Sequence, residues 1–208
     1  MAHNINFNEQ TQQHSFFSVK EKAWHGLGQI VEDYPSSKEA LQFAGLDYEV
    51  CKRPNIHRLD NGNEIISTNS FYTYRTDSNA ILGDRLGKDY EVVQNTDAFS
   101  FFDAIVDGDG IQYETAGALG KGEKIFITAK LPGYIKVGND DMIEKYLFLT
   151  TSHDGFGSIM AAFIPIRIVC NNTLNAALKN CNNAIKIRHT ANVKERLEQA
   201  HKVMGISN

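Results

Sequence analysis

The sequence has few cysteines and no long apolar run, and each shortage excludes a class of protein. Its three cysteines are Cys51, Cys170 and Cys181. None belongs to a CxxC pair or a cysteine–histidine cluster, so neither a disulfide framework nor a zinc site is expected. The longest apolar stretch, residues 158–170, is interrupted by Pro165 and Arg167 and is shorter than the roughly 18 residues of a membrane-spanning helix. Because the first thirty residues also lack an apolar signal segment, we expect a soluble, cytoplasmic protein with no membrane partner.

Recognisable catalytic patterns are missing as well. His153-Asp154 has no evident nucleophile or third partner, so a turn in which Asp154 bonds its own backbone is favoured over catalysis. The stretch Gly117–Gly122 lacks the GxxxxGK[ST] pattern and precedes a strand, which predicts a flexible turn instead of a phosphate loop. We therefore expect a protein that is not an enzyme and holds no cofactor or metal ion.

Composition and turn signals predict the domain organisation. The chain has 208 residues, of which 42% are hydrophobic and 22% charged, as is usual for a globular protein. Residues 1–20 are expected to be a flexible N-terminal arm because their first part is rich in asparagine and glutamine. Residues 21–208 are expected to form a single α+β domain, with a subdivision near residues 110–122 as the alternative. Trp24, beside two glycines, suggests a tight turn anchored by the indole.

The first half carries clear helix-capping and turn signals. Ser36, followed by Glu39, predicts the start of a helix that stops at Gly45. Asp60–Asn63 contains Asn-Gly, which favours a hairpin turn between strands over residues 48–59 and 64–75. Thr96-Asp97 caps a second helix.

The second half is predicted to contain three consecutive strands followed by a helix. Strands are predicted over residues 124–131, 142–151 and 158–169, followed by a helix over 174–180, a short strand over 184–188 and a final amphipathic helix after Thr190. Pro132-Gly133 is expected to break the first of these strands. Consecutive strands most often pair as an antiparallel meander. The expected fold class is therefore α+β, with antiparallel sheets, covering helices and a strand-strand-strand-helix second half.

The formal net charge of −4 conceals an asymmetry along the chain. From Phe156 to Asn208 there are seven basic and two acidic residues, a charge of +5, which leaves −9 for the first 155 residues. A basic segment on an acidic protein fits a polyanion-facing surface, and a solvated basic face explains it equally well.

Five cations of this segment are candidate nucleic-acid contacts: Arg167, Lys186, Arg188, Lys194 and Arg196. Phe156 is the candidate for stacking on bases. Lys186 and Arg188 share one face of the short strand, and Lys194 follows across a single turn. We expect all five cations to converge near the end of the second-half sheet.

Three separate stretches together resemble one known family. They are Trp24–Gly28, then Thr151–Gly155 with Ile164–Leu174, and finally Ile187–Thr190. These stretches are similar, in the same order, to motifs of the phage/plasmid-like proteins of unknown function called the domain of unknown function 932 family. The resemblance implies a prophage, plasmid or conjugative-element origin and supplies no activity.

Two functions follow as the leading hypotheses, and an enzyme that uses His153, Asp154 and Arg167 ranks last. The first is a nucleic-acid-binding protein in recombination or replication, comparable with single-strand annealing proteins, whose partner is single-stranded DNA or another nucleic acid. The alternative is a non-enzymatic protein-interaction or anti-defence factor that binds a host or phage protein. A homo-oligomer is compatible with either hypothesis.

Overall fold

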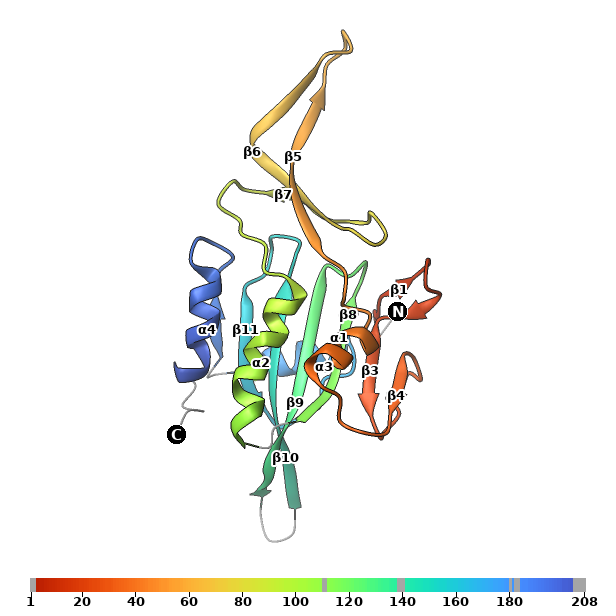
Figure 1. Cartoon of the computed structure of the whole chain (residues 1–208), viewed down its shortest axis with the longest axis vertical. Helices are drawn as coiled ribbons and strands as arrows, with labels where there is room; N and C mark the ends of the chain where they lie inside the picture. Colours follow the sequence, from red (N-terminus) through yellow and green to blue (C-terminus); the bar gives the residue numbers. More distant parts are fainter. Residues whose placement is uncertain (1–2, 110–111, 138–140, 180, 182–183, 204–208) are drawn as a thin grey trace.

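A seven-stranded sheet forms the centre of the computed structural model, which describes residues 3–109, 112–137, 141–179, 181 and 184–203 (Figure 1). The strand order is β12-β11-β10-β9-β8-β3-β4. The strands are β3 (Phe16–Val19), β4 (Gln29–Val31), β8 (Gln112–Leu119), β9 (Lys124–Val137), β10 (Asp141–Ser152), β11 (Ile159–Ile164) and β12 (Ile185–Ile187). All neighbours are antiparallel except β3 and β4. The predicted antiparallel meander is therefore confirmed as β9, β10 and β11.

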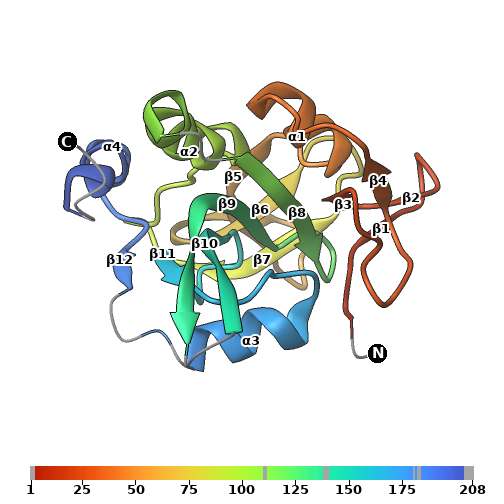
Figure 2. The same ribbon diagram turned by 90° about the horizontal axis from the view of Figure 1, so that it is seen from below.

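Helices cover both faces of this sheet, as Figure 2 shows. On one face lie α1 (Ser37–Phe43), α2 (Asn95–Asp109) and α4 (Val193–Val203), and on the other lies α3 (Asn171–Lys179). The predicted start of α1 is confirmed, since Ser36 and Glu39 form a reciprocal capping box. The order β9, β10, β11, α3 is the strand-strand-strand-helix pattern predicted for an α+β fold.

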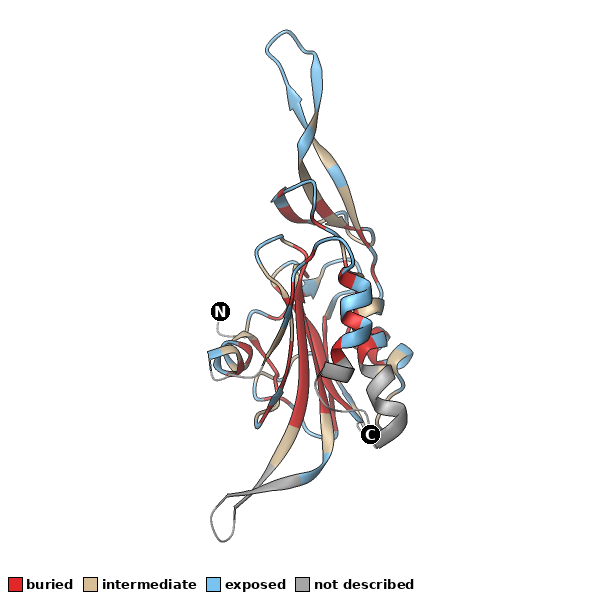
Figure 3. Ribbon diagram, turned by 90° about the vertical axis from the view of Figure 1, so that its left-hand side faces the viewer, coloured by how far each residue is buried: buried red, intermediate tan, exposed pale blue. Residues whose placement is uncertain are grey.

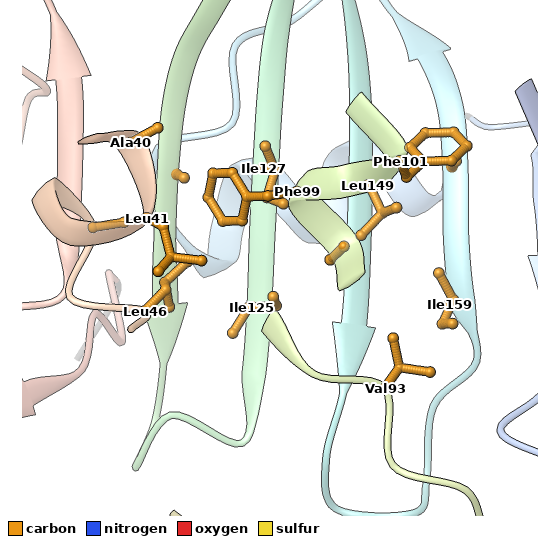
Figure 4. Close-up of a cluster of buried hydrophobic side chains, with 14 of the residues drawn as sticks. Ala40, Leu41, Leu46, Val93, Phe99, Phe101, Ile125, Ile127, Leu149 and Ile159 are labelled. Atoms are coloured by element: carbon orange, nitrogen blue, oxygen red, sulfur yellow. The ribbon is translucent and has the colours of Figure 1, made fainter. Parts of the chain in front are cut away.

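Each face of the sheet buries its own apolar cluster, because successive strand residues point to opposite sides. Beneath α1 and α2, Phe99 packs near Ile127 and Leu149 (Figure 4). Beneath α3, Leu174 joins a second cluster with Phe126 and Phe148. Fully burying a side chain of this size stabilises the fold by about 1.5–3 kcal/mol.

A second, three-stranded sheet has the order β5-β6-β7 and sits at one end of the first. Its strands are β5 (Val50–Arg58), β6 (Glu64–Arg75) and β7 (Ile81–Leu86). The predicted turn at Asp60–Asn63 joins β5 to β6, with Gly62 at φ +82°. The outer halves of β5 and β6 project as an exposed two-stranded ribbon (Figure 3).

The expected flexible arm over residues 1–20 differs from the structure. The short strands β1 (Phe7–Asn8) and β2 (Gln13–His14) pair with each other, and β3 pairs with β8 inside the main sheet. Phe16 and Phe17 are fully buried, one in each apolar cluster. The amide-rich composition of the first residues predicted a loose arm, but Phe16 and Phe17 pack on opposite faces of the sheet and hold this segment in place.

The expected flexible turn over Gly117–Gly122 is also wrong in its first half. Gly117 to Leu119 belong to the buried strand β8. A side chain at Gly117 would bring its Cβ within 2.7 Å of the Ser15 carbonyl oxygen, so glycine permits the close approach of β3. The small residues mark tight strand packing, and the turn begins only at Gly120.

The strand ends near two prolines differ from those predicted. β9 continues past Pro132-Gly133 to Val137, because Pro132 falls at the register shift between β9 and β10, where the ladder does not need its N–H. Conversely, β11 ends at Ile164, directly before Pro165, and not at Val169. Arg167 therefore lies in the connection to α3. Of the predicted positions, Asn180 and Met204 lie outside the described residues.

Candidate nucleic-acid interface

Arg167 forms a partly buried ion pair and is not part of an exposed basic patch. Its guanidinium donates to the Glu114 carboxylate at 3.0 Å and lies 3.4 Å from the Glu21 carboxylate. Burial raises the pKa of Glu114, and the bond from Arg167 opposes that rise. The positive charge of Arg167 thus compensates the negative charge of Glu114, a buried residue of β8.

Lys194 lies on the opposite face of the main sheet. It belongs to α4 and pairs with Asp97 of α2 at 3.2 Å, across a helix–helix contact. Arg167 instead borders Ile168, which packs in the cluster beneath α3. The predicted convergence of all five cations is therefore wrong, because proximity along the chain does not determine the face on which a side chain lies.

Lys186 and Arg188 are exposed at the edge strand β12 and its following turn. Between them, Ile187 is buried in the cluster beneath α2 and α4. By alternation, Lys186 points to the other side, the face covered by α3. Within the described ranges, neither Lys186 nor Arg188 forms an ion pair. Arg196 is exposed on α4, toward the other face.

The segment that contains Lys186 and Arg188 is free of acidic residues. No Asp or Glu occurs between Asp154 and Glu195. This segment folds into β11, α3 and β12, and α3 adds the exposed Lys179. We define the α3 face as the outer surface of α3 together with Lys186 and Arg188. Lys179 was missed at the sequence level, although the acid-free run around it was a usable signal.

A turn over Ala23–Leu27 lies at the N-terminal side of α3. The ring nitrogen Nε2 of His25 lies 2.8 Å from the Val169 carbonyl oxygen, two residues before α3 begins. Trp24 itself is 65% exposed, so the indole does not anchor the turn as expected. Ala23 and Leu27, which pack in the cluster beneath α3, do so instead.

Two buried histidines connect the loops at the end of the main sheet. His153 is fully buried, with Nε2 2.9 Å from Asn95 Oδ1, and burial lowers its pKa to about 3. His189 lies 3.0 Å from Thr151 Oγ1 and stacks on Tyr90. Burial lowers the pKa of His189 too. The Thr151–Gly155 and Ile187–Thr190 stretches therefore hold the loops at this end of the sheet together.

The loop after His153 has the predicted conformation. The Phe156 N–H donates to Asp154 Oδ1 at 2.8 Å, which confirms the turn closed by Asp154 on its own backbone. Phe156 is 79% exposed and lines an open pocket of about 460 Å³ with Asp84, Glu123 and Asp154. Three carboxylates, against the ammonium group of Lys121 in the same pocket, disfavour a phosphate here. Phe156 is therefore a poor candidate for stacking on bases.

More than half of the chain matches a known family. A family model described as a domain of unknown function (DUF932) matches residues 84–208. The chain belongs to the DUF932 family. This confirms the suspected family, and the match contains the second and third of the sequence stretches, whereas Trp24–Gly28 precedes it. No curated protein matches the chain, and no solved structure does.

The DUF932 match covers the main sheet from β8 to β12 and the helices α2, α3 and α4. It therefore contains the α3 face and both buried histidines, whereas the Ala23–Leu27 turn and the ribbon precede it. Among the described residues of this DUF932 protein, no cluster of three or more His, Cys, Asp or Glu side chains has a metal-binding arrangement. Within the same part of the chain, no helix has the length and apolar character to cross a membrane.

Proposed function

We propose that this protein binds single-stranded nucleic acid on its α3 face. One observation carries the proposal: the acid-free segment between Asp154 and Glu195 folds so that Lys179, Lys186 and Arg188 are exposed with no acidic residue near them in sequence. Lysine and arginine on such a surface neutralise phosphates and release counterions. This contribution to binding is electrostatic and does not depend on the nucleotide sequence. It fits a net-acidic protein that has one basic region.

The role that we propose is in recombination or replication of a mobile element, through annealing of single strands. The strand-strand-strand-helix order and the DUF932 membership support this role by analogy. Faster annealing of two complementary oligonucleotides in the presence of the protein is the expected result. An unchanged annealing rate, with binding intact, would contradict the annealing role and leave the binding proposal standing.

A salt titration of oligonucleotide binding tests the proposal directly. We expect a fluorescently labelled single strand to bind, with an affinity that falls as salt rises. The double variant Lys186→Ala with Arg188→Ala should bind more weakly, and the slope of log K against log salt should fall by about 1.4, or 0.7 for each phosphate that is no longer neutralised. The free energy of unfolding should change by less than about 0.5 kcal/mol, because both side chains are exposed.

A matched control removes the same charge elsewhere. Arg85 and Lys88 are exposed and lie at the end of β7 and in the loop that follows. Arg85→Ala with Lys88→Ala should leave the binding slope close to that of the unchanged protein. Equal reductions in the two double variants would show a general charge effect, and the α3 face would then not be the interface.

The exposed ribbon favours a second candidate function, binding to another protein. Ile56 lies directly opposite Ile66 in the β5–β6 register, and these side chains are 57% and 62% exposed. Leu59 and Ile65 are also exposed. Apolar side chains gathered on a projecting element are typical of an interaction site. A host protein, a phage protein or a second copy of this chain fits that description.

The ribbon has its own test. Ile56→Ser with Ile66→Ser should reduce capture of a nuclease-resistant protein partner, or convert a dimer to a monomer in sedimentation velocity, with little loss of stability. Unchanged capture and unchanged sedimentation would remove this second function.

A further inference from the structure

Trp24 is the only tryptophan in the chain, and its indole is 65% exposed. The neighbouring residue Ala23 is buried, so the turn itself is packed while the largest side chain in it faces solvent. The indole meets the ring of His25 edge-on, with 5.5 Å between the ring centroids, and the rest of its surface is open. The exposed ring is therefore available for a ligand.

The turn that presents Trp24 is held by several bonds. The Gly26 N–H donates to the Ala23 carbonyl oxygen at 2.9 Å, and the Leu27 N–H donates to His25 Nδ1 at 3.1 Å. Since Nδ1 accepts this bond, Nε2 carries the proton and donates to the Val169 carbonyl oxygen at 2.8 Å. Both ring nitrogens of His25 are thus engaged, and the backbone on either side of Trp24 is fixed before any ligand binds.

A cation lies in the same turn. A Cβ atom built on Gly26 would be 3.0 Å from Lys22 Cε and 3.4 Å from its Nζ, so the ammonium group lies over Gly26. Glu21, between Lys20 and Lys22, is directed to Arg167 at 3.4 Å. The carboxylate next to Lys22 in the chain is therefore partly neutralised, while Lys22 is exposed.

We infer that Trp24 is a stacking platform for an unpaired nucleobase, with Lys22 placed to meet a phosphate of the same strand. The inference rests on the proposed function and names its aromatic contact. An exposed aromatic ring beside a cation recognises single strands, because every base has a π face and every nucleotide a phosphate. The His25–Val169 bond joins the turn to the N-terminal side of α3, and α3 carries the exposed Lys179. A protein partner is the competing occupant, and the test separates the two.

The single tryptophan provides the measurement. Addition of oligothymidylate should quench the intrinsic fluorescence, whereas an abasic oligonucleotide with the same number of phosphates should not. Trp24→Ala should weaken oligothymidylate binding by about 5- to 150-fold, the range measured when one base-stacking aromatic is removed. The same variant should leave abasic binding unchanged, and Trp24→Phe should restore part of the affinity.

Matched variants and outcomes complete the design. Phe156→Ala removes another highly exposed aromatic side chain and should bind as the unchanged protein does. Circular dichroism checks that each variant is folded. If oligonucleotides bind by polarisation but neither quench Trp24 nor respond to Trp24→Ala, the inference is overturned and the proposed function stands. If no oligonucleotide binds at low salt, both fail. Quenching by a nuclease-treated protein fraction, with none by oligothymidylate, would assign the turn to a protein partner instead.

Discussion

Gly28 marks the closest approach between the Ala23–Leu27 turn and the main sheet. It has φ +77°, and a Cβ atom built there would lie 2.2 Å from the Phe16 carbonyl oxygen. Both the left-handed backbone and the lack of space require glycine. Because backbone on the other side of the contact belongs to β3, neither partner moves without disturbing the sheet.

Gly28→Ala should therefore destabilise the protein by about 3 kcal/mol or more, from backbone strain and displacement of β3 together. Chemical denaturation followed by circular dichroism measures it. Gly62→Ala is the control, since Gly62 has a similar φ of +82° but no atom within 4 Å of the added Cβ. That variant should lose only about 1–2 kcal/mol. Equal destabilisation would show that the close approach at Gly28 has no energetic weight.

At the scale of elements, Arg75 attaches the second sheet to the rest of the molecule. It is 2% exposed at the end of β6 and forms a bidentate pair with Asp77, both bonds 2.7 Å. It also donates to Asn6 Oδ1 and to the Lys121 carbonyl oxygen, from the N-terminal segment and the β8–β9 turn. Its guanidinium stacks on Tyr48 at 3.8 Å. One side chain thus joins four separate segments.

Arg75→Lys should destabilise the protein by about 3 kcal/mol, although charge is kept, because a single ammonium cannot reproduce the planar set of bonds. Thermal unfolding of the variant gives the size of the effect. Arg85→Lys, at a side chain that is 82% exposed, should stay within about 0.5 kcal/mol of the unchanged protein. A similarly small effect at Arg75 would mean that other contacts hold the second sheet.

At the scale of the whole molecule, buried histidines link folding to pH. Burial, with smaller contributions from His189 and Arg75, lowers the pKa of His153 to about 3, far below the ordinary value of 6.5. Between these two pKa values the unfolded chain binds a proton that the folded chain does not. Stability from this group is therefore complete above pH 6.5 and is lost as the pH falls toward 3. The lowered pKa values of His25 and His189 act in the same direction.

The free energy of unfolding should consequently fall between pH 6.5 and 5, with a slope for the His153 contribution that grows from about 0.7 to about 1.3 kcal/mol per pH unit. Urea denaturation at several pH values measures this slope. His153→Gln should reduce the slope whatever its own effect on stability. His57→Gln, at an exposed ribbon position, should leave the slope unchanged. A slope that persists in the His153 variant would place the linkage at other groups.

Local signals in the sequence were sufficient for most elements. The Ser36–Glu39 capping box, the Asn-Gly turn at residues 61–62 and the β-branched strands of the second half act over a few residues, so they predicted α1, the ribbon and the meander. The same holds for the turn closed by Asp154. The strand ends near prolines were predicted wrongly. β9 continues past Pro132 through a register shift, and β11 ends before Pro165, where the connection to α3 begins.

Which face a residue occupies was decided only by tertiary structure. Arg167 and Lys194 lie in one basic segment of the sequence, yet α3 and α4 cover opposite faces, and each cation meets a carboxylate distant in the chain. The exposure of Trp24 and the burial of Phe16 likewise depend on strands that are far apart in sequence. Charge and local conformation are properties of short segments, so the sequence determined them. Burial and convergence depend on long-range packing, which exists only in the folded chain.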